Sequence, residues 1–286
     1  MNIQIFAKPL LFVLFITICS FSVSAQTKTL LKRTIYKTDK LDFCPCGTLV
    51  VNGAPNGSIR VEGWNQNEIE LSAEIHINAE TENEIEQLTK VTGFLLEESL
   101  GRTGIMSFGT HDKSYLKSVS KKFPKHLIGM PFSIDYVIKV PRFCDLQING
   151  GKGDLNISGV EGIMKINYLE TNAVVDLVGG GITATFGSGD VVVKVPTRGW
   201  RGRFADIQLA SGTMHVSLPP GLNAEIDASI LRSGKIENEY ASLKPRTRKV
   251  EFTEKLISAK SGVGGVPLKF TVGDGTLNIF ANRKPD

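Results

Sequence analysis

Short runs in which apolar and polar residues alternate dominate the chain beyond residue 47. From Glu68 to Asn78 the odd-numbered positions are apolar and the even-numbered positions are polar, and from Phe132 to Pro141 the apolar residues take the even-numbered positions. A period of two predicts strands that bury one face. We therefore expect half-buried strands over both segments, the second ended by Pro141, whose nitrogen carries no hydrogen for the ladder.

A five-residue phrase recurs later in the chain: a glycine, a small or polar residue, and then an apolar, polar, apolar triplet. Copies stand at 153–157, 189–193, 212–216, 234–238 and 275–279, with a related form at 173–177 in which Ala173 replaces the glycine, and earlier forms begin at Gly47 and Gly57. Further short strands are expected between the copies, over 164–168, 182–186, 204–209 and 222–230. Two strands per step of about 20 residues, with glycine at the corner, are typical of a β-solenoid. We expect the copy at 275–279 to be the last strand of the stack.

The predicted fold is therefore all-β, with a β-solenoid or β-helix-like stack of short strands over residues 142–286. A small β-rich region over 26–141 precedes the stack and is expected to be continuous with it. One short helix is predicted over 82–92, because Thr81 and Glu84 form a capping box before apolar residues at helical spacing.

The first 25 residues predict a secretory signal peptide. Lys8 precedes an apolar run from Leu10 to Val23, and Val23-Ser-Ala25 offers the small residues of a cleavage site. The run is short for a bilayer core of about 30 Å, and no later run is longer, so we expect no transmembrane segment. The mature chain is then exported, to the periplasm, the cell surface or the medium. A surface lipoprotein attached at Cys19 is the minor alternative.

Charge is nearly balanced, with 33 basic and 29 acidic residues and a formal net charge of +4. Nucleic-acid-binding proteins usually carry a basic stripe, which is missing from this sequence, so nucleic acid is not an expected partner. One basic patch lies between His111 and His126 and contains Lys113, Lys117, Lys121 and Lys122. A solvated loop is the favoured interpretation, and contact with an anionic glycan or membrane surface is the alternative.

Three cysteines remain after signal cleavage: Cys44, Cys46 and Cys144. In an oxidising compartment either Cys44 or Cys46 could form a disulfide with Cys144, or the thiols could simply be buried. The spacing of Cys44-Pro-Cys46 differs from the two-residue spacing of zinc knuckles, and no histidine lies nearby. A structural role is therefore favoured over a metal or redox role.

Several polar residues in the repeats are better explained by structure than by catalysis. Asp154 and Asp190 directly follow a corner glycine, where aspartate caps turns, and Asp176 and His215 occupy outward positions. Trp200, beside Arg201 and Arg203, could be a sugar-stacking platform, although packing over a rung is favoured. We therefore expect no catalytic, cofactor-binding or metal-ligating residues, and no cofactor.

The segments Gly57-Ser-Ile-Arg-Val-Glu-Gly-Trp64 and Ile134-Asp-Tyr-Val-Ile-Lys-Val-Pro141, followed by the Gly-Asp pairs at 153 and 189, resemble the bacterial putative-adhesin family of unknown function. The resemblance extends from about Gly47 to Ile279. It implies an exported, non-enzymatic surface or envelope interaction protein of unknown ligand, for which a cell-surface glycan or an envelope component is the candidate partner. A carbohydrate-active enzyme on the same scaffold and a purely structural envelope component are the alternatives.

Overall fold

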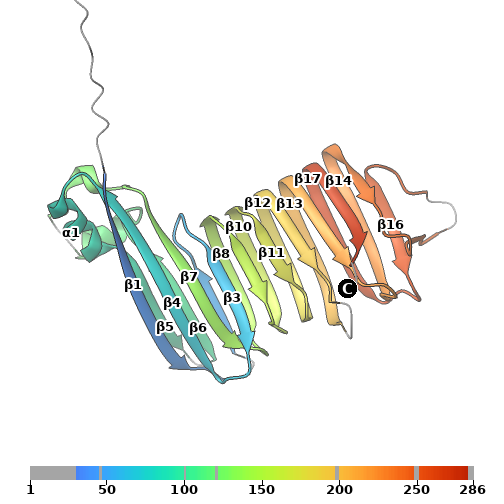
Figure 1. Cartoon of the computed structure of the whole chain (residues 1–286), viewed down its shortest axis with the longest axis horizontal. Coiled ribbons are helices and arrows are strands. Elements are labelled where there is room, and N and C mark those ends of the chain that lie inside the picture. The colour runs from blue at the N-terminus through green and yellow to red at the C-terminus, as the bar shows by residue number, and fades with distance from the viewer. Residues whose placement is uncertain are drawn as a thin grey trace, which may run out of the picture.

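The computed structural model describes residues 30–44, 47–99, 101–119, 122–196, 200–247 and 251–282. The predicted signal peptide, Cys46 and Lys121 lie outside these ranges. The described chain consists mainly of strands laid side by side along the long axis of the molecule (Figure 1). The all-β prediction is confirmed, whereas the β-solenoid stays a prediction.

The first half of the chain contains seven strands and the helices among the described residues. The elements are β1 (Leu31–Asp42), β2 (Thr48–Asn52), β3 (Ile59–Trp64), β4 (Glu68–Ala79), α1 (Glu82–Val91), β5 (Gly93–Ser99), β6 (Arg102–Phe108), α2 (Lys113–Val119), the 3-10 turn η1 (Lys125–Leu127) and β7 (Phe132–Pro141).

The second half contains strands only, within the described ranges. They are β8 (Asp145–Lys152), β9 (Leu155–Ser158), β10 (Ile163–Glu170), β11 (Ala173–Asp176), β12 (Gly179–Lys194), β13 (Arg201–Leu218), β14 (Ala224–Asn238), β15 (Lys244–Pro245), β16 (Leu256–Ser261) and β17 (Val266–Ala281).

Parallel pairing organises these strands into two ladders. The first ladder runs β6, β2, β8, β10, then the first halves of β12, β13, β17 and β14. The second runs β7, β3, β9, β11, then the second halves of the same four strands. Each rung therefore contributes one stretch to each ladder and turns a corner between them. The ladders continue across residue 141 without a break, and the division there stays a prediction.

Glycines of the recurring phrase stand at the corners. Gly189, Gly212, Gly275 and Gly234 pair with one another in successive rungs and have φ between 116° and 136°. A Cβ on Gly212 would lie 2.0 Å from the carbonyl oxygen of Gly189. Neither this backbone conformation nor this spacing admits a side chain, which explains why the phrase begins with glycine.

The spatial order of the rungs differs from their order in the sequence. β17 lies between β13 and β14 and pairs with both, so the expectation that residues 275–279 form the last strand is wrong. Likewise β2 and β3 lie between the β6–β7 rung and the β8–β9 rung. Every copy of the phrase has the same pattern of apolar and polar residues, so the pattern does not determine the order in which the rungs stack in space.

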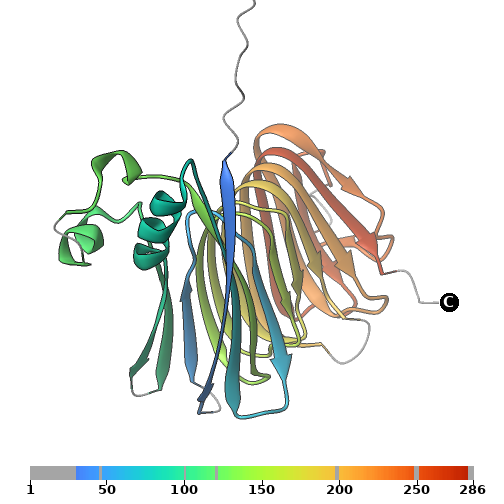
Figure 2. The ribbon, with the colours of Figure 1, turned by 60° about the vertical axis from the view of Figure 1, so that its left-hand side comes forward.

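Antiparallel strands and helices complete the two ends. β4 and then β1 extend the second ladder beyond β7, β5 extends the first beyond β6, and β16 and β15 follow β14. Helix α1 lies at the β1 end (Figure 2) and starts with the predicted capping box of Thr81 and Glu84. Helix α2 forms where a loop was expected; the Asp112 carboxylate accepts bonds from the backbone nitrogens of Ser114 and Tyr115.

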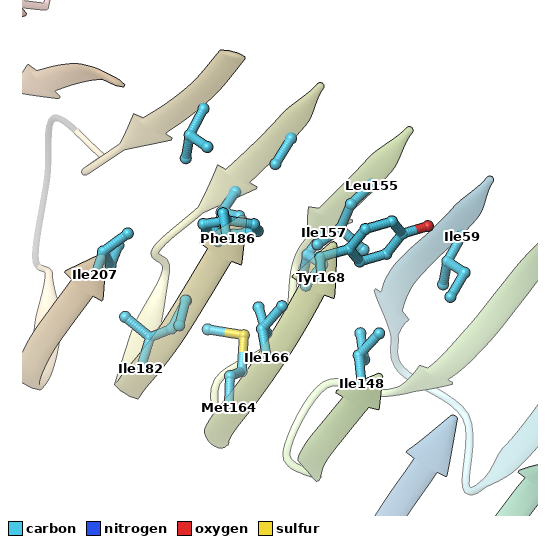
Figure 3. Close-up of a cluster of buried hydrophobic side chains, with 14 of the residues drawn as sticks. Ile59, Ile148, Leu155, Ile157, Met164, Ile166, Tyr168, Ile182, Phe186 and Ile207 are labelled. Atoms are coloured by element: carbon cyan, nitrogen blue, oxygen red, sulfur yellow. The ribbon is translucent and has the colours of Figure 1, made fainter. Parts of the chain in front are cut away.

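The core lies between the two ladders. Ile148, Ile166 and Ile207 of the first ladder and Ile157 of the second are all at most 1% exposed, and Figure 3 shows such side chains gathered between the strands. Full burial of one aliphatic side chain stabilises the fold by about 1.5–3 kcal/mol. The outward rows are polar: Asn149 donates to Asn52 at 2.9 Å, and Asn167 donates to Asn149 at 3.1 Å.

Candidate functional site

The residues expected to make surface contacts do not form one site. Lys113 and Lys117 lie on α2, and Lys122 follows that helix, near the β1 end of the molecule. Trp200 instead precedes β13, in the other half of the stack (Figure 1). Its ring is partly buried against the core, and a Cβ on Gly202 would lie 2.0 Å from that ring. The lysines and the tryptophan therefore cannot share a ligand of ordinary size.

The pairing of β2 with β8 brings two of the cysteine-bearing segments side by side. Thr48 pairs with Asp145, and the Asp145 nitrogen donates to the Gly47 carbonyl at 3.0 Å. Cys44 is exposed and Cys144 is buried, and within the described residues no disulfide joins them. The disulfide to Cys144 stays a prediction.

A cavity of about 270 Å³ lies where successive rungs begin, and we name it the Arg203 cavity. Its walls come from the segments that open β8, β10, β12 and β13, which lie next to one another in the first ladder. The lining residues are Phe143, Cys144, Asp145, Glu161, Gly162, Ile163, Gly180 and Arg203.

A β-bulge places the arginine for which the cavity is named. Gly180 pairs with Gly202 but Gly181 pairs with Phe204, so Arg203 is an extra residue without a partner in β12. Bulges turn a side chain away from the regular alternation and are common beside functional sites. The Arg203 side chain is exposed, and within the described ranges it makes no ion pair or hydrogen bond. Its guanidinium is thus a free set of donors at the mouth of the cavity.

Two further arginines are held by one buried carboxylate. The Glu161 side chain is 6% exposed; Arg142 Nε donates to its Oε1 at 2.6 Å, and an Arg201 nitrogen lies 3.3 Å from its Oε2. Gly179 leaves room for this arrangement, since a Cβ there would lie 3.1 Å from the Glu161 carboxylate. The carboxylate therefore fixes the positions of both guanidinium groups.

Phe143 presents an aromatic ring beside these charges. It is 54% exposed, although it is large and apolar. The Arg142 guanidinium carbon lies 5.8 Å from the centre of the ring, within the range of a cation–π contact. Because Arg142 is also bound to Glu161, the ring is held at the rim of the cavity.

The remaining polar groups of the cavity are engaged or inert. Burial, helped by the charge of Asp145, raises the pKa of the Cys144 thiol to about 12, so the thiol stays protonated near neutral pH and is a poor nucleophile. The Asp145 carboxylate accepts a hydrogen bond from the Ile163 nitrogen at 2.7 Å. This arrangement is suited to holding an anion and an apolar face by non-covalent contacts.

Sequence reasoning named Arg201 and Arg203 only as neighbours of Trp200, and it missed Phe143, Arg142 and Glu161. One signal was available: Arg142 and Phe143 directly follow the proline that ends β7, where an aromatic residue has no place in the alternating pattern. Among the described residues, no helix is long and apolar enough to cross a membrane, and no group of three or more His, Cys, Asp or Glu side chains could hold a metal ion.

No family model and no curated protein matches this chain. Among solved structures, the chain is similar to a putative cell adhesion protein from Clostridium sporogenes ATCC 15579, with 12% identity, 87% of this chain and 100% of that chain covered, and a TM-score of 0.48. It is also similar to a putative adhesin from Bacteroides fragilis NCTC 9343, with 12% identity, coverage of 86% and 97%, and a TM-score of 0.35. A putative lipid binding protein from Parabacteroides distasonis ATCC 8503 has 12% identity, coverage of 85% and 96%, and a TM-score of 0.28. Similarity this low carries no argument about what this chain does.

Proposed function

We propose that the protein is an exported, non-enzymatic interaction module of the cell surface or envelope, in which a β-solenoid presents the Arg203 cavity to a partner. The parallel ladders and their corner glycines support the solenoid. The observation that carries the function is the free guanidinium of Arg203 beside the exposed ring of Phe143. Neither group is engaged in a way that would block a ligand: the ring can bury apolar surface against it, and the guanidinium can donate hydrogen bonds to it.

A carbohydrate-active enzyme on the same scaffold is the second candidate, because two carboxylates line the cavity. Sugar hydrolysis requires one carboxyl group to give up a proton while the other acts as base or nucleophile. Glu161 is instead bound to two arginines, and Asp145 is bound to a backbone amide. Both carboxylates are therefore already engaged by groups of the protein, and neither is left free to act on a substrate. Binding is therefore the better supported function.

A glycan array combined with a hydrolysis screen tests the proposal on the mature chain, residues 26–286. We expect binding without product release, and we expect Phe143→Ala and Arg203→Ala each to weaken it. Arg60→Ala is the matched control, because Arg60 is an exposed arginine on β3 that pairs with Glu62 and does not line the cavity. Release of product would support the enzyme instead. Binding that both cavity variants leave unchanged would refute the assigned site, and silence towards glycans and envelope fractions would refute the function.

A further inference from the structure

We infer that the Arg203 cavity recognises a single sugar unit that carries a carboxylate, such as a uronic acid. This inference rests on the proposed function, since it names the class of ligand for the same cavity. Three features of the cavity lead to it: its charge, its aromatic rim and its size.

The charges around the cavity leave one positive charge without a partner. Arg142, Arg201 and Arg203 face two carboxylates, those of Glu161 and Asp145, and the unpaired guanidinium is that of Arg203. A guanidinium is planar and matches a carboxylate through two parallel hydrogen bonds. A ligand with one negative charge would balance the cavity. A doubly charged phosphate monoester would leave the cavity with an excess negative charge.

The exposed ring of Phe143 accounts for the sugar. One face of a pyranose ring carries C–H groups, which are apolar and slightly positive, and the face of an aromatic ring is slightly negative. A sugar stacked on Phe143 would therefore lie in the cavity that the Arg203 side chain also lines. A bare inorganic anion would need Arg203 but would gain nothing from the ring.

The size of the cavity limits the ligand to one unit. Its volume of about 270 Å³ lies below the range of about 300–1,000 Å³ typical of sites for drug-sized ligands. A terminal or branching sugar fits this volume better than an extended stretch of polysaccharide. Gly162 and Gly180 also line the cavity, and a Cβ on Gly180 would lie 2.0 Å from the Gly162 carbonyl oxygen, so this part of the wall consists of closely packed backbone.

Isothermal titration calorimetry of the mature chain with four probes tests the inference: methyl β-D-glucuronide, methyl β-D-glucoside, glucose 6-sulfate and sodium sulfate. We expect the glucuronide to bind at least about tenfold more tightly than the glucoside, a difference of about 1.4 kcal/mol. Arg203→Ala should remove that preference, and Arg203→Lys should restore only part of it, because lysine keeps the charge and loses the planar fork. Phe143→Ala should weaken both sugars.

Two exposed residues outside the cavity serve as controls. Arg60→Ala and Tyr36→Ala should leave all four titrations unchanged, and circular dichroism should show that every variant is folded. Equal affinity for glucoside and glucuronide, tighter binding of the sulfated sugar, or no binding of any sugar would each overturn the inference. So would sulfate binding that Phe143→Ala leaves intact, because that result describes a simple anion site. A positive glycan array would leave the proposed function standing in all of these cases.

Discussion

At the scale of single residues, the corner glycines hold the rungs at their observed spacing. Gly212 has φ of 134° and would place a Cβ 2.0 Å from the Gly189 carbonyl oxygen, whereas Gly101 has φ of 71° and no atom within 4 Å of its Cβ position. We expect Gly101→Ala to cost about 1–2 kcal/mol of unfolding free energy, from backbone strain alone. Gly212→Ala should cost about 3 kcal/mol or more, because the neighbouring backbone must also move. Urea unfolding of both variants measures the difference. Equal losses of unfolding free energy would show that the backbone at the corner moves easily enough to accept a side chain.

Asp274 links β17 to β14 at the same scale. Arg232 Nε donates to its carboxylate at 2.7 Å and Ser233 Oγ donates at 2.8 Å, and these bonds lower the pKa of Asp274 from 3.8 to about 2. A lowered carboxyl pKa stabilises the folded state above the unfolded pKa, and this contribution is lost as the pH falls through the folded pKa. Asp274→Asn should therefore be less stable than the natural chain at pH 6, and the two should converge as the pH falls from about 4 to about 2.

Urea unfolding across that pH range checks the Asp274 prediction. Both side chains of the pair are exposed to solvent, so 1 M salt should also reduce the difference at pH 6. A gap between the two proteins that widens towards pH 2 would contradict the assignment of the low pKa to Asp274.

At the scale of elements, helix α1 depends on its first turn. The Glu84 nitrogen donates to the Thr81 hydroxyl at 3.3 Å, and the Thr81 nitrogen donates to the Glu84 carboxylate at 3.1 Å. We expect Thr81→Ala to lower the unfolding free energy by about 1 kcal/mol, because a backbone donor loses its partner. Thr81→Ser keeps the hydroxyl and is the matched control, so the two variants should separate in urea unfolding. Equal stability of the two would show that the hydroxyl does not matter.

The elements that sequence predicts best are those whose own residues determine them. The alternation over 68–78 and 132–141 and the capping box at Thr81 were sufficient, and β4, β7 and α1 follow them closely. β1 was not predicted, because it is an edge strand with most of its residues exposed. A strand shows alternating apolar and polar residues only where one of its faces is buried. Helix α2 was missed because its seven residues carry one buried side chain, Leu116, and hence no apolar period.

The candidate site was harder to predict than the elements around it. Arg203 is unpaired because β13 has one residue more than β12 at that point, and this depends on which strands pair. Arg142, Glu161 and Arg201 come together only because the rungs that begin with β8, β10, β12 and β13 are stacked. Contacts of this kind follow from the order of the rungs in space, which a repeating pattern leaves undetermined.

At the scale of the whole molecule, strands from the early and the late parts of the described chain pair with strands from its middle. In a simple solenoid each repeat contacts only its neighbours in sequence, and stability is a sum over repeats. Here β2 pairs with β8, so that Asn52 lies beside Asn149, and β17 pairs with β13, so that Ala205 lies beside Leu268. Such long-range pairing closes large loops during folding, which predicts slow folding and a cooperative transition rather than the loss of one rung at a time.

Removal of β17 tests this cooperativity directly. β17 is the partner of β13 from Ala205 to Leu218 and of β14 from Ala224 to Asn238, so a chain ending at Gly265 leaves a gap between two long strands. If the rungs were stacked in sequence order, loss of the final strand would disturb the last rung alone. With β17 between them, both β13 and β14 lose a full ladder of backbone hydrogen bonds and the cover of their apolar rows. We therefore expect amide hydrogen exchange in β13 to accelerate as strongly as in β14, or the shortened chain to aggregate through its exposed edges.

A chain ending at Asn282 keeps all of β17 and should match the full chain. If β13 keeps its protection in the shorter chain, the stack tolerates a missing rung and the ends are not coupled.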